Sequence, residues 1–232
     1  RKGYPYEFSA HVPMVLRWPE SYAVAVSRGT RVRPPVVTEL RDIFHTFVDI
    51  ANLSAVVKAT YGDRFEATDG KSMLCLLSDP TGKESCSYSV NPGPWRSHID
   101  LEHSTCYNES NHWNALTNGE TKYVYRAFYG DEQLFDVSRD PEERADVSGV
   151  PAYTDVLEAW RSTLVHQFER EGRGPSWVSS NGTLVRREKG TTYSPNYPSD
   201  FRIDRVRGEG SLTASSASRV VVDEDDPAAM LV

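Results

Sequence analysis

The chain has 232 residues, of which 38% are hydrophobic, 25% charged and 11% aromatic, as in a globular protein with a sizeable core. Its 26 lysines and arginines against 33 aspartates and glutamates give a net charge of −7, which argues against a nucleic-acid partner. No apolar run approaches the roughly 20 residues that cross a bilayer, so no membrane span is predicted.

The first third of the chain has the pattern of an α/β unit. Residues 12–18 are almost all apolar and are followed by Pro19, which predicts a short strand buried on both faces in a parallel sheet. Apolar residues then recur at spacings of three and four over 37–51 and predict an amphipathic helix that ends near Asn52. The opposite face of that helix holds Glu39, Arg41, Asp42, His45 and Asp49. A strand followed by a helix is the unit of an α/β sheet, so residues 1–53 are predicted to end an α/β core.

The rest of the chain divides by its pattern into a connection, a subdomain and a tail. Residues 54–95 carry many turn signals and predict an irregular connection with one short helix near 71–78. Short β-like runs followed by a helical period predict a small α+β subdomain over 96–198. Residues 199–232 are rich in serine, alanine and acidic side chains, which predicts a disordered tail.

Within the predicted subdomain two elements are well marked. The runs at 122–128 and 133–137 are separated by a glycine-containing turn, which predicts a β-hairpin. Apolar residues between Tyr153 and Phe168 recur at helical spacing and predict a helix stopped by Gly172.

Cysteines and sequons bear on the compartment. The three cysteines match no zinc or redox spacing and are expected to be buried or inert thiols: Cys75, Cys86 and Cys106. Glycosylation sequons begin at Asn52, Asn108 and Asn181, more than chance supplies, which favours the secretory route without fixing it.

Several polar residues are candidates for a site. Lys2 precedes a glycine and leads toward the predicted strand, where an α/β fold places its ligand. His11 either faces an anion or forms a hydrogen bond at the start of the strand.

Residues 98–103 alternate in strand fashion, with one face formed by His98, Asp100 and Glu102 and the other by Ile99, Leu101 and His103. Metal binding, lining of a pocket and structural hydrogen bonding all remain open for this segment. His112 and Trp113 are assigned to hairpin packing rather than sugar binding. Asp140 to Glu143 are assigned to a turn with a solvated acidic face.

Four segments, taken in order, resemble the sulfatases of the alkaline-phosphatase superfamily, in particular the C-terminal half of an arylsulfatase. Lys2-Gly-Tyr-Pro-Tyr-Glu7, with the following Val-Pro and Trp-Pro, is similar to the family's Lys-Gly-x-x-Tyr-Glu segment. The helix at 37–51 is similar to the family's Asp-Ile-x-x-Thr-x-x-Asp-x-Ala helix. Residues 113–124 resemble its Lys-Tyr hairpin, and residues 132–143 resemble its Gln-Leu-Tyr-Asp and Asp-Pro-x-Glu segment.

The resemblance implies a fold and an activity. The fold is the last strand and helix of an alkaline-phosphatase-like α/β/α core, followed by a small α+β subdomain. The activity is hydrolysis of a sulfate ester by a formylglycine beside a calcium ion. The family's Cys/Ser-x-Pro-x-Arg motif and metal-ligand segments do not occur in this chain. The nucleophile and the Ca²⁺ ligands are therefore expected upstream of residue 1, and this chain alone is expected to be inactive.

The resemblance also assigns a role to one residue. Lys2 is the one catalytic position that the resemblance carries over, and it corresponds to the lysine that contacts the sulfate oxygens. His11 and His103, chosen from their own positions in the sequence, are the candidate substrate-binding residues. Two alternatives stay open: a phosphonate or phosphate ester hydrolase of the same superfamily, and a noncatalytic binding protein that keeps the sulfatase fold. The sequence predicts neither the natural substrate nor the oligomeric state.

Overall fold

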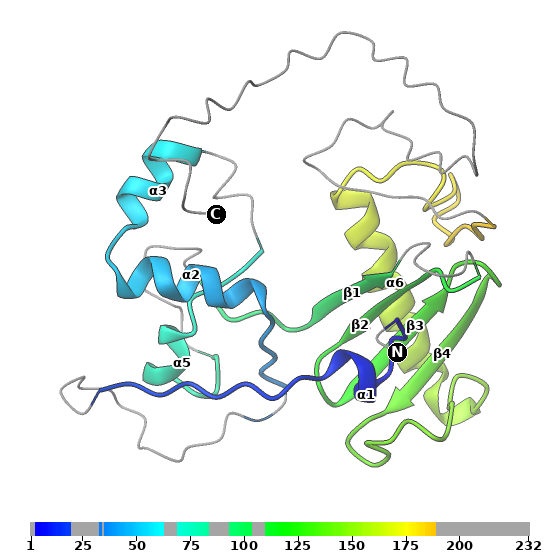
Figure 1. Ribbon diagram of the computed structural model, residues 1–232. Helices are drawn as coiled ribbons and strands as arrows, with labels where there is room; N and C mark the ends of the chain where they lie inside the picture. The colour runs from blue at the N-terminus through cyan, green and yellow to red at the C-terminus, as the bar shows by residue number, and fades with distance from the viewer. Residues whose placement is uncertain are drawn as a thin grey trace, which may run out of the picture.

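The computed structural model describes residues 3–19, 33, 35–62, 69–83, 93–103 and 110–188. These residues form two lobes that lie side by side (Figure 1). The helical lobe comprises residues 12–19, 35–62, 69–83 and 93–98, and the sheet lobe comprises residues 3–11, 99–103 and 110–188. Lys2 and the predicted tail at 199–232 lie outside the described residues.

The sheet lobe is built on a four-stranded antiparallel sheet. Its strands are β1 (Ile99–His103), β2 (Trp113–Thr117), β3 (Thr121–Arg126) and β4 (Asp131–Asp136), and they pair in sequence order. A short 3₁₀ turn, η1 (Pro151–Tyr153), leads into the long helix α6 (Thr154–Arg170). The predicted hairpin and the predicted second helix are both confirmed, and so is the α+β character of this part of the chain.

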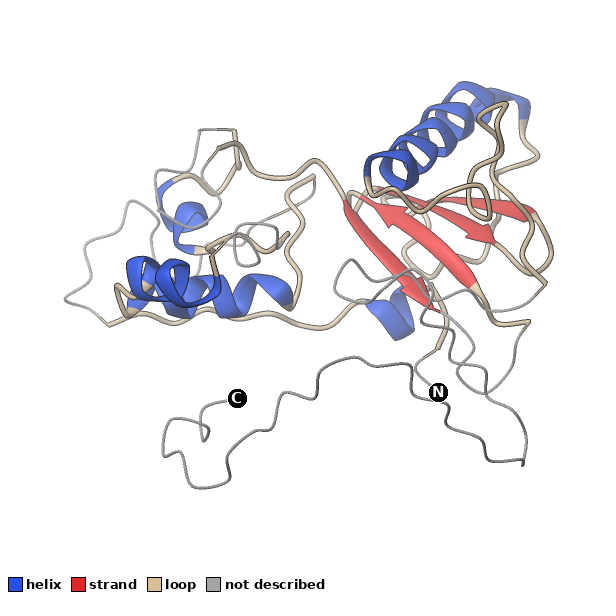
Figure 2. Ribbon diagram, turned by 90° about the horizontal axis from the view of Figure 1, so that it is seen from above, coloured by secondary structure: helices blue, strands red, loops and turns tan. Residues whose placement is uncertain are grey.

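Both faces of the sheet are covered. On one face, Leu116, Tyr123 and Leu134 pack with Leu164 and Phe168 of α6. On the other face an apolar cluster receives the ring of Tyr6 from the N-terminal segment: Trp113, Ala115, Val124, Phe135 and Val137. The short helix α1 (Glu7–Ala10) lies on this second face, opposite α6 (Figure 2). Alternate residues of each strand are therefore buried on opposite sides, as the strand period requires.

The helical lobe contains three short helices, α2 (Arg41–Ile50), α3 (Ser54–Tyr61) and α5 (Leu74–Ser78). The predicted helices at 37–51 and near 71–78 are confirmed as α2 and α5. Asn52 ends α2 with a positive φ of 55°, as its position suggested. Helix α3 was not predicted, because its eight residues have no strong amphipathic period. None of the helices in the described part of the chain is long and apolar enough to cross a membrane.

Helix α2 buries the face that the sequence predicted to be outside. Asp42, His45 and Thr46 are buried, whereas Phe44 and Phe47 are exposed. The reason is the number of partners on the polar side. The Asp42 carboxylate accepts both Nη groups of Arg96 and the backbone N–H groups of Glu39 and Lys71. These hydrogen bonds fix the helix on its lobe together with two apolar contacts, the burial of Val48 and the packing of Ile43 against the cluster around Trp95.

The predicted buried strand at 12–18 is a second difference. Residues 11–19 are extended but belong to no strand, and Val12, Met14 and Val15 are exposed. A strand needs a neighbour for its backbone N–H and C=O groups. No strand within the described ranges lies beside this segment, so it forms no ladder.

The cysteine prediction is also corrected. Cys75, on α5, is disulfide-bonded rather than a free thiol. Both other cysteines, Cys86 and Cys106, lie outside the described residues.

Candidate functional site

The N-terminal segment, residues 3–11, follows the candidate catalytic residue Lys2 and is held on the sheet lobe. Gly3 is buried, and its carbonyl oxygen accepts two hydrogen bonds. Asn111 Nδ2 donates at 2.6 Å and Trp113 Nε1 donates at 3.0 Å. The backbone directly after Lys2 is therefore fixed by the start of β2.

His103 lies beside the same glycine. Its ring stacks on the Trp113 ring, with centroids 5.9 Å apart and planes 12° from parallel. Its Nδ1 lies 2.8 Å from the carbonyl oxygen of Asn111. A carbonyl oxygen only accepts hydrogen bonds, so Nδ1 of His103 carries a proton and donates it to Asn111. The second ring nitrogen, Nε2, takes no part in this hydrogen bond.

A Cβ placed on Gly3 would lie 3.5 Å from His103 Nε2. The structure thus brings one predicted substrate-binding residue next to the residue that follows Lys2. Any side chain larger than glycine at position 3 would occupy the space in front of that nitrogen.

His11 lies at the other end of the N-terminal segment. It is the residue after α1, and its Nδ1 lies 2.8 Å from Glu7 Oε2. Its side chain is 72% exposed. The structure therefore pairs His11 with a carboxylate of its own segment and does not bring it to His103.

A buried ionic cluster joins the N-terminal segment to the sheet. Lys122 Nζ lies 2.6 Å from Glu7 Oε1 and 2.8 Å from Glu143 Oε1. The Lys122 side chain is fully buried, and that of Glu143 is 1% exposed. The backbone N–H of Glu7 donates to Glu143 Oε2 at 2.5 Å. We call Glu7, Lys122 and Glu143 the anchor cluster.

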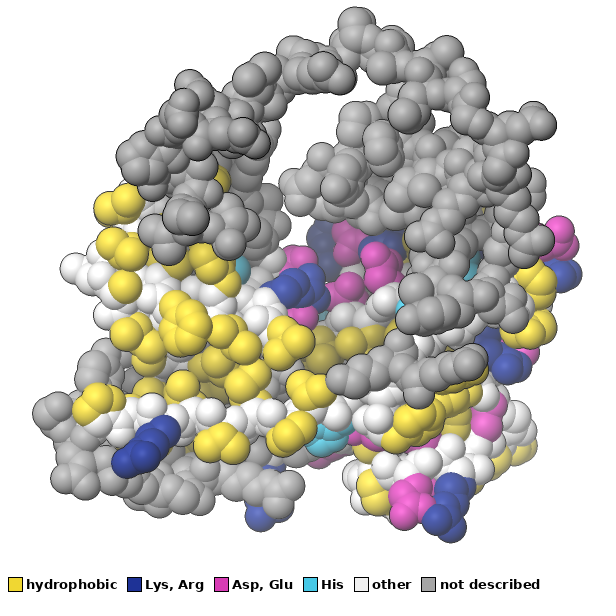
Figure 3. All heavy atoms as spheres, viewed as in Figure 1, with side chains coloured by type: hydrophobic (Ala, Val, Ile, Leu, Met, Phe, Trp, Pro, Cys, Tyr) yellow, Lys and Arg dark blue, Asp and Glu magenta, His cyan; other side chains and the backbone are white. Residues whose placement is uncertain are grey.

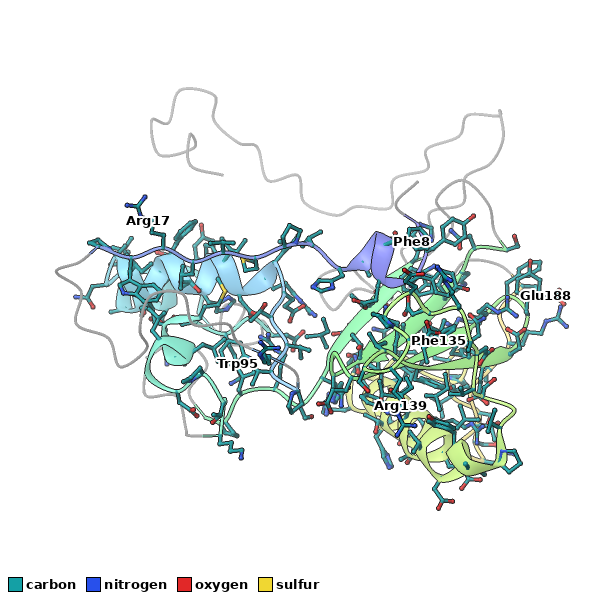
Figure 4. The ribbon with its side chains drawn as sticks, turned by 90° about the horizontal axis from the view of Figure 1, so that it is seen from below. Phe8, Arg17, Trp95, Phe135, Arg139 and Glu188 are labelled. Atoms are coloured by element: carbon teal, nitrogen blue, oxygen red, sulfur yellow. The ribbon has the colours of Figure 1, made fainter. Side chains whose placement is uncertain are left out.

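Sequence reasoning missed the anchor cluster. Glu143 was expected on a solvated acidic face, and this expectation is wrong because the residue is buried and adopts a positive φ of 53°. One signal was present: Lys122 is in phase with Val124, on the apolar side of β3, where a lysine needs partners. Figure 4 shows α1, on which Phe8 is labelled, against the sheet lobe that contains Phe135.

The row of His98, Asp100 and Glu102 serves structural contacts. Asp100 Oδ1 accepts from Arg41 Nη2 at 2.9 Å, which links β1 to α2 across the two lobes. Glu102 Oε2 accepts from Arg173 Nη1 at 2.7 Å. The ring of His98 meets that of Trp160 edge to face, and burial lowers the pKa of His98.

A metal site is not supported in this region. In the described part of the chain no three His, Cys, Asp or Glu side chains gather as a metal ion requires. Of the three interpretations left open for residues 98–103, the contacts favour structural hydrogen bonding for Asp100 and Glu102. His103 stands apart from them because it faces the N-terminal segment.

Relatives of this chain are found among curated sulfatases, although no family model matches it. An arylsulfatase of Clostridium perfringens is 28% identical over 185 residues, which are 79% of this chain and 32% of that protein. Human arylsulfatase K is 29% identical over 180 residues, 72% of this chain and 29% of that protein. The chain thus spans about a third of the length of the curated relatives it matches.

Solved structures resemble it only in part. A protein solved in complex with its substrate D-glucosamine-2-N,6-O-disulfate is 17% identical, with a TM-score of 0.40 over 56% of this chain and 23% of that one. The phosphonate monoester hydrolase of Agrobacterium radiobacter is 18% identical, with a TM-score of 0.37 over 56% of this chain and 24% of that one.

Proposed function

This chain belongs to the sulfatase family, and on that premise we propose that it forms part of a sulfuric ester hydrolase of the arylsulfatase type. The observation that carries the proposal is the fixed segment after Lys2. Gly3 is held by two donors, and Glu7 is held by a buried lysine. A backbone that is held directly after it is one support that a charged catalytic group needs.

Lys2 supplies a compact positive charge to the sulfate oxygens in this proposal. Transfer of a sulfuryl group leaves negative charge on the peripheral and leaving oxygens, and a fixed ammonium stabilises that charge. His103 adds a polar contact to the ester through Nε2, because Nδ1 is already engaged by Asn111. His11, paired with Glu7, lies at the outer end of the segment and contacts a more distant part of the substrate.

The nucleophile and the calcium ion require residues beyond these 232 in this proposal. No Cys/Ser-x-Pro-x-Arg motif occurs in the sequence. The side chains that the structure describes do not fit a calcium site, so no step is assigned to the metal here.

Two observations support further polypeptide completing the site. The chain covers about a third of its relatives, and the exposed apolar side chains of α2 lie beside those of residues 12–15 (Figure 3). A contiguous apolar surface of this kind is typical of an interface. We assign it to the remainder of the catalytic core.

The test is a substitution of Lys2 in the enzyme that carries a confirmed formylglycine. Lys2→Ala is expected to lower kcat/KM for an aryl sulfate by about 100-fold or more, since a positioned charge donor has about that effect. Lys2→Arg restores little, because a planar guanidinium cannot replace an ammonium at the same point. Activity of Lys2→Ala within about threefold of the parent would contradict the assignment.

Two controls accompany that measurement. His166→Ala changes an exposed histidine of α6 whose ring pairs with Glu169, and it should leave kcat/KM unchanged. The 232-residue chain by itself should not hydrolyse a nitrophenyl sulfate above a mock preparation. Faster turnover of a phenyl phosphonate than of the matching sulfate would instead identify a phosphonate hydrolase.

A further inference from the structure

Helix α1 cannot be stable by its own hydrogen bonds. It has four residues, far fewer than the roughly 12 to 15 that an isolated helix needs in water. Phe8, at its centre, is 76% exposed and adds little apolar burial. The position of this helix must therefore come from contacts made by its other side chains and by its ends.

Glu7 makes the strongest of these contacts. Its Oε1 faces Lys122 Nζ at 2.6 Å, its Oε2 faces His11 at 2.8 Å, and its backbone N–H donates to Glu143. The only other side-chain bond from this helix region to the sheet runs from Tyr6 Oη to Gln133 at 3.0 Å, among the residues that the structure describes. Glu7 thus joins α1 to β3 and to the turn after β4.

The anchor cluster holds two carboxylates around one ammonium inside the lobe. A buried lysine is costly unless its charge is fully paired, and without it the buried Glu143 and the partly buried Glu7 carboxylates repel each other. Removing Lys122 would therefore do more than delete one contact. It would leave Glu7 and Glu143 facing each other, and the side that is free to move is the short N-terminal segment.

We propose that Lys122, through Glu7 and Glu143, is a positioning residue that holds residues 3–10, the segment directly after Lys2, on the sheet. The role given to Lys2 rests on the proposed function, whereas the anchoring itself does not. The turn that carries Glu143 is thereby part of the site without touching substrate. Its positive φ at a non-glycine residue is the kind of local strain that a functional geometry maintains.

The first test is amide hydrogen exchange on the 232-residue chain. The N–H groups of Ser9, Ala10 and His11 bond to Tyr6 and Glu7 carbonyl oxygens within α1. In Lys122→Met these amides are expected to exchange at least about tenfold faster, while the amides of β2 and β3 keep their protection. Unchanged exchange in α1 would overturn the proposal.

Arg126→Met is the matched control. Arg126 lies on the same strand and pairs with Asp131, but both side chains are partly exposed, at 39% and 44%. This variant should leave α1 exchange as in the parent. If Lys122→Met does not fold, Glu7→Gln removes the same pairing from outside the sheet and should accelerate α1 exchange in the same way. No acceleration in a folded Glu7→Gln chain would overturn the proposal.

A second-site change separates charge from shape. Lys122→Met combined with Glu143→Gln removes the ammonium and one of the two carboxylates, and the amide oxygen still accepts the Glu7 N–H. Exchange in α1 should return toward the parent rate. If the double variant exchanges as fast as Lys122→Met alone, repulsion between the two carboxylates does not release α1 and the charge argument fails.

The activity test joins this inference to the proposed function. In the formylglycine-bearing enzyme, Lys122→Met should lower kcat/KM when Lys2 is present and have little further effect in a Lys2→Ala background. If the losses of kcat/KM from the two substitutions instead multiply, as independent effects do, the link between Lys122 and Lys2 is overturned. Full activity of Lys2→Ala would refute the proposed function, while the exchange results would still decide the anchoring.

Discussion

The two lobes differ in how far they cover their own apolar side chains. In the sheet lobe the largest buried groups are mainly apolar or aromatic, including Tyr123, Leu134 and Phe168, and both faces of the sheet are covered. In the helical lobe α2 buries Asp42 and exposes Phe47. The sheet lobe covers both faces of its sheet within the chain, whereas the helical lobe has a small apolar core around Met73, Leu76 and Trp95 and leaves Phe47 on the outside. An apolar period therefore identifies a face that is suited to burial, but not the element that buries it.

The largest effect is expected from Asp42→Ala. The carboxylate is fully buried and takes both Nη groups of Arg96 at 2.7 and 2.5 Å. Its removal leaves Arg96 and two backbone N–H groups without their acceptor, which should cost about 3–5 kcal/mol. Amide exchange should show the loss in residues 69–78 and not in the strands. Asp69→Ala, at an exposed partner of Arg41, should change little.

Leu164→Ala tests the other lobe. Leu164 is 1% exposed and packs between α6 and the sheet. The cavity should lower the free energy of unfolding by about 2–5 kcal/mol, measured with urea. Val156→Ala on the same helix, where the side chain is 38% exposed, should remain within about 0.5 kcal/mol. Equal losses in the two variants would contradict the placement of Leu164 in the core of the sheet lobe.

His98 probes the boundary between the lobes through pH. Burial lowers its pKa from the ordinary 6.5, so the folded chain binds the proton less tightly than the unfolded chain. Stability is therefore unaffected above about pH 6.5 and is lost as the pH falls below it. His98→Gln should flatten this part of the stability profile. His166→Gln, at an exposed histidine, should not, and the same flattening there would refute the assignment.

The smallest effect on stability is expected from Phe47→Ser. The side chain is 63% exposed on the apolar side of α2, so the free energy of unfolding should change by less than about 0.5 kcal/mol. Binding of a hydrophobic dye and self-association should both fall, because the exposed apolar area is smaller. A stability loss above about 1 kcal/mol would mean that this face is covered within the chain.

The elements predicted best from the sequence are those that residues close together in the chain determine. The period around α6, the turn before β4 and the residue that ends α2 are local signals, and all three elements formed as expected. The segment at 12–18 has the composition of a buried strand, but strand pairing depends on another segment that no local pattern identifies.

The candidate site shows the same limit. The family resemblance pointed to Lys2 and the Lys-Tyr and Asp-Pro-x-Glu segments separately. That Lys122 and Glu143 meet Glu7 depends on contacts across 115 and 136 positions. Burial of Glu143 follows from that meeting, because an isolated acidic turn would be solvated.

The order of the strands has a consequence for how the protein assembles. Strands β1 to β4 each pair with the next along the chain, so the sheet closes through short connections and can form early. The segment at 3–11, by contrast, is synthesised before the sheet and must wait for partners at Trp113 and Glu143, 110 and 136 positions later. Closing so long a loop is slow and comes after local structure. The segment at 3–11 is therefore among the last to dock, and a nascent chain holds it on the sheet only once the turn after β4 has been synthesised.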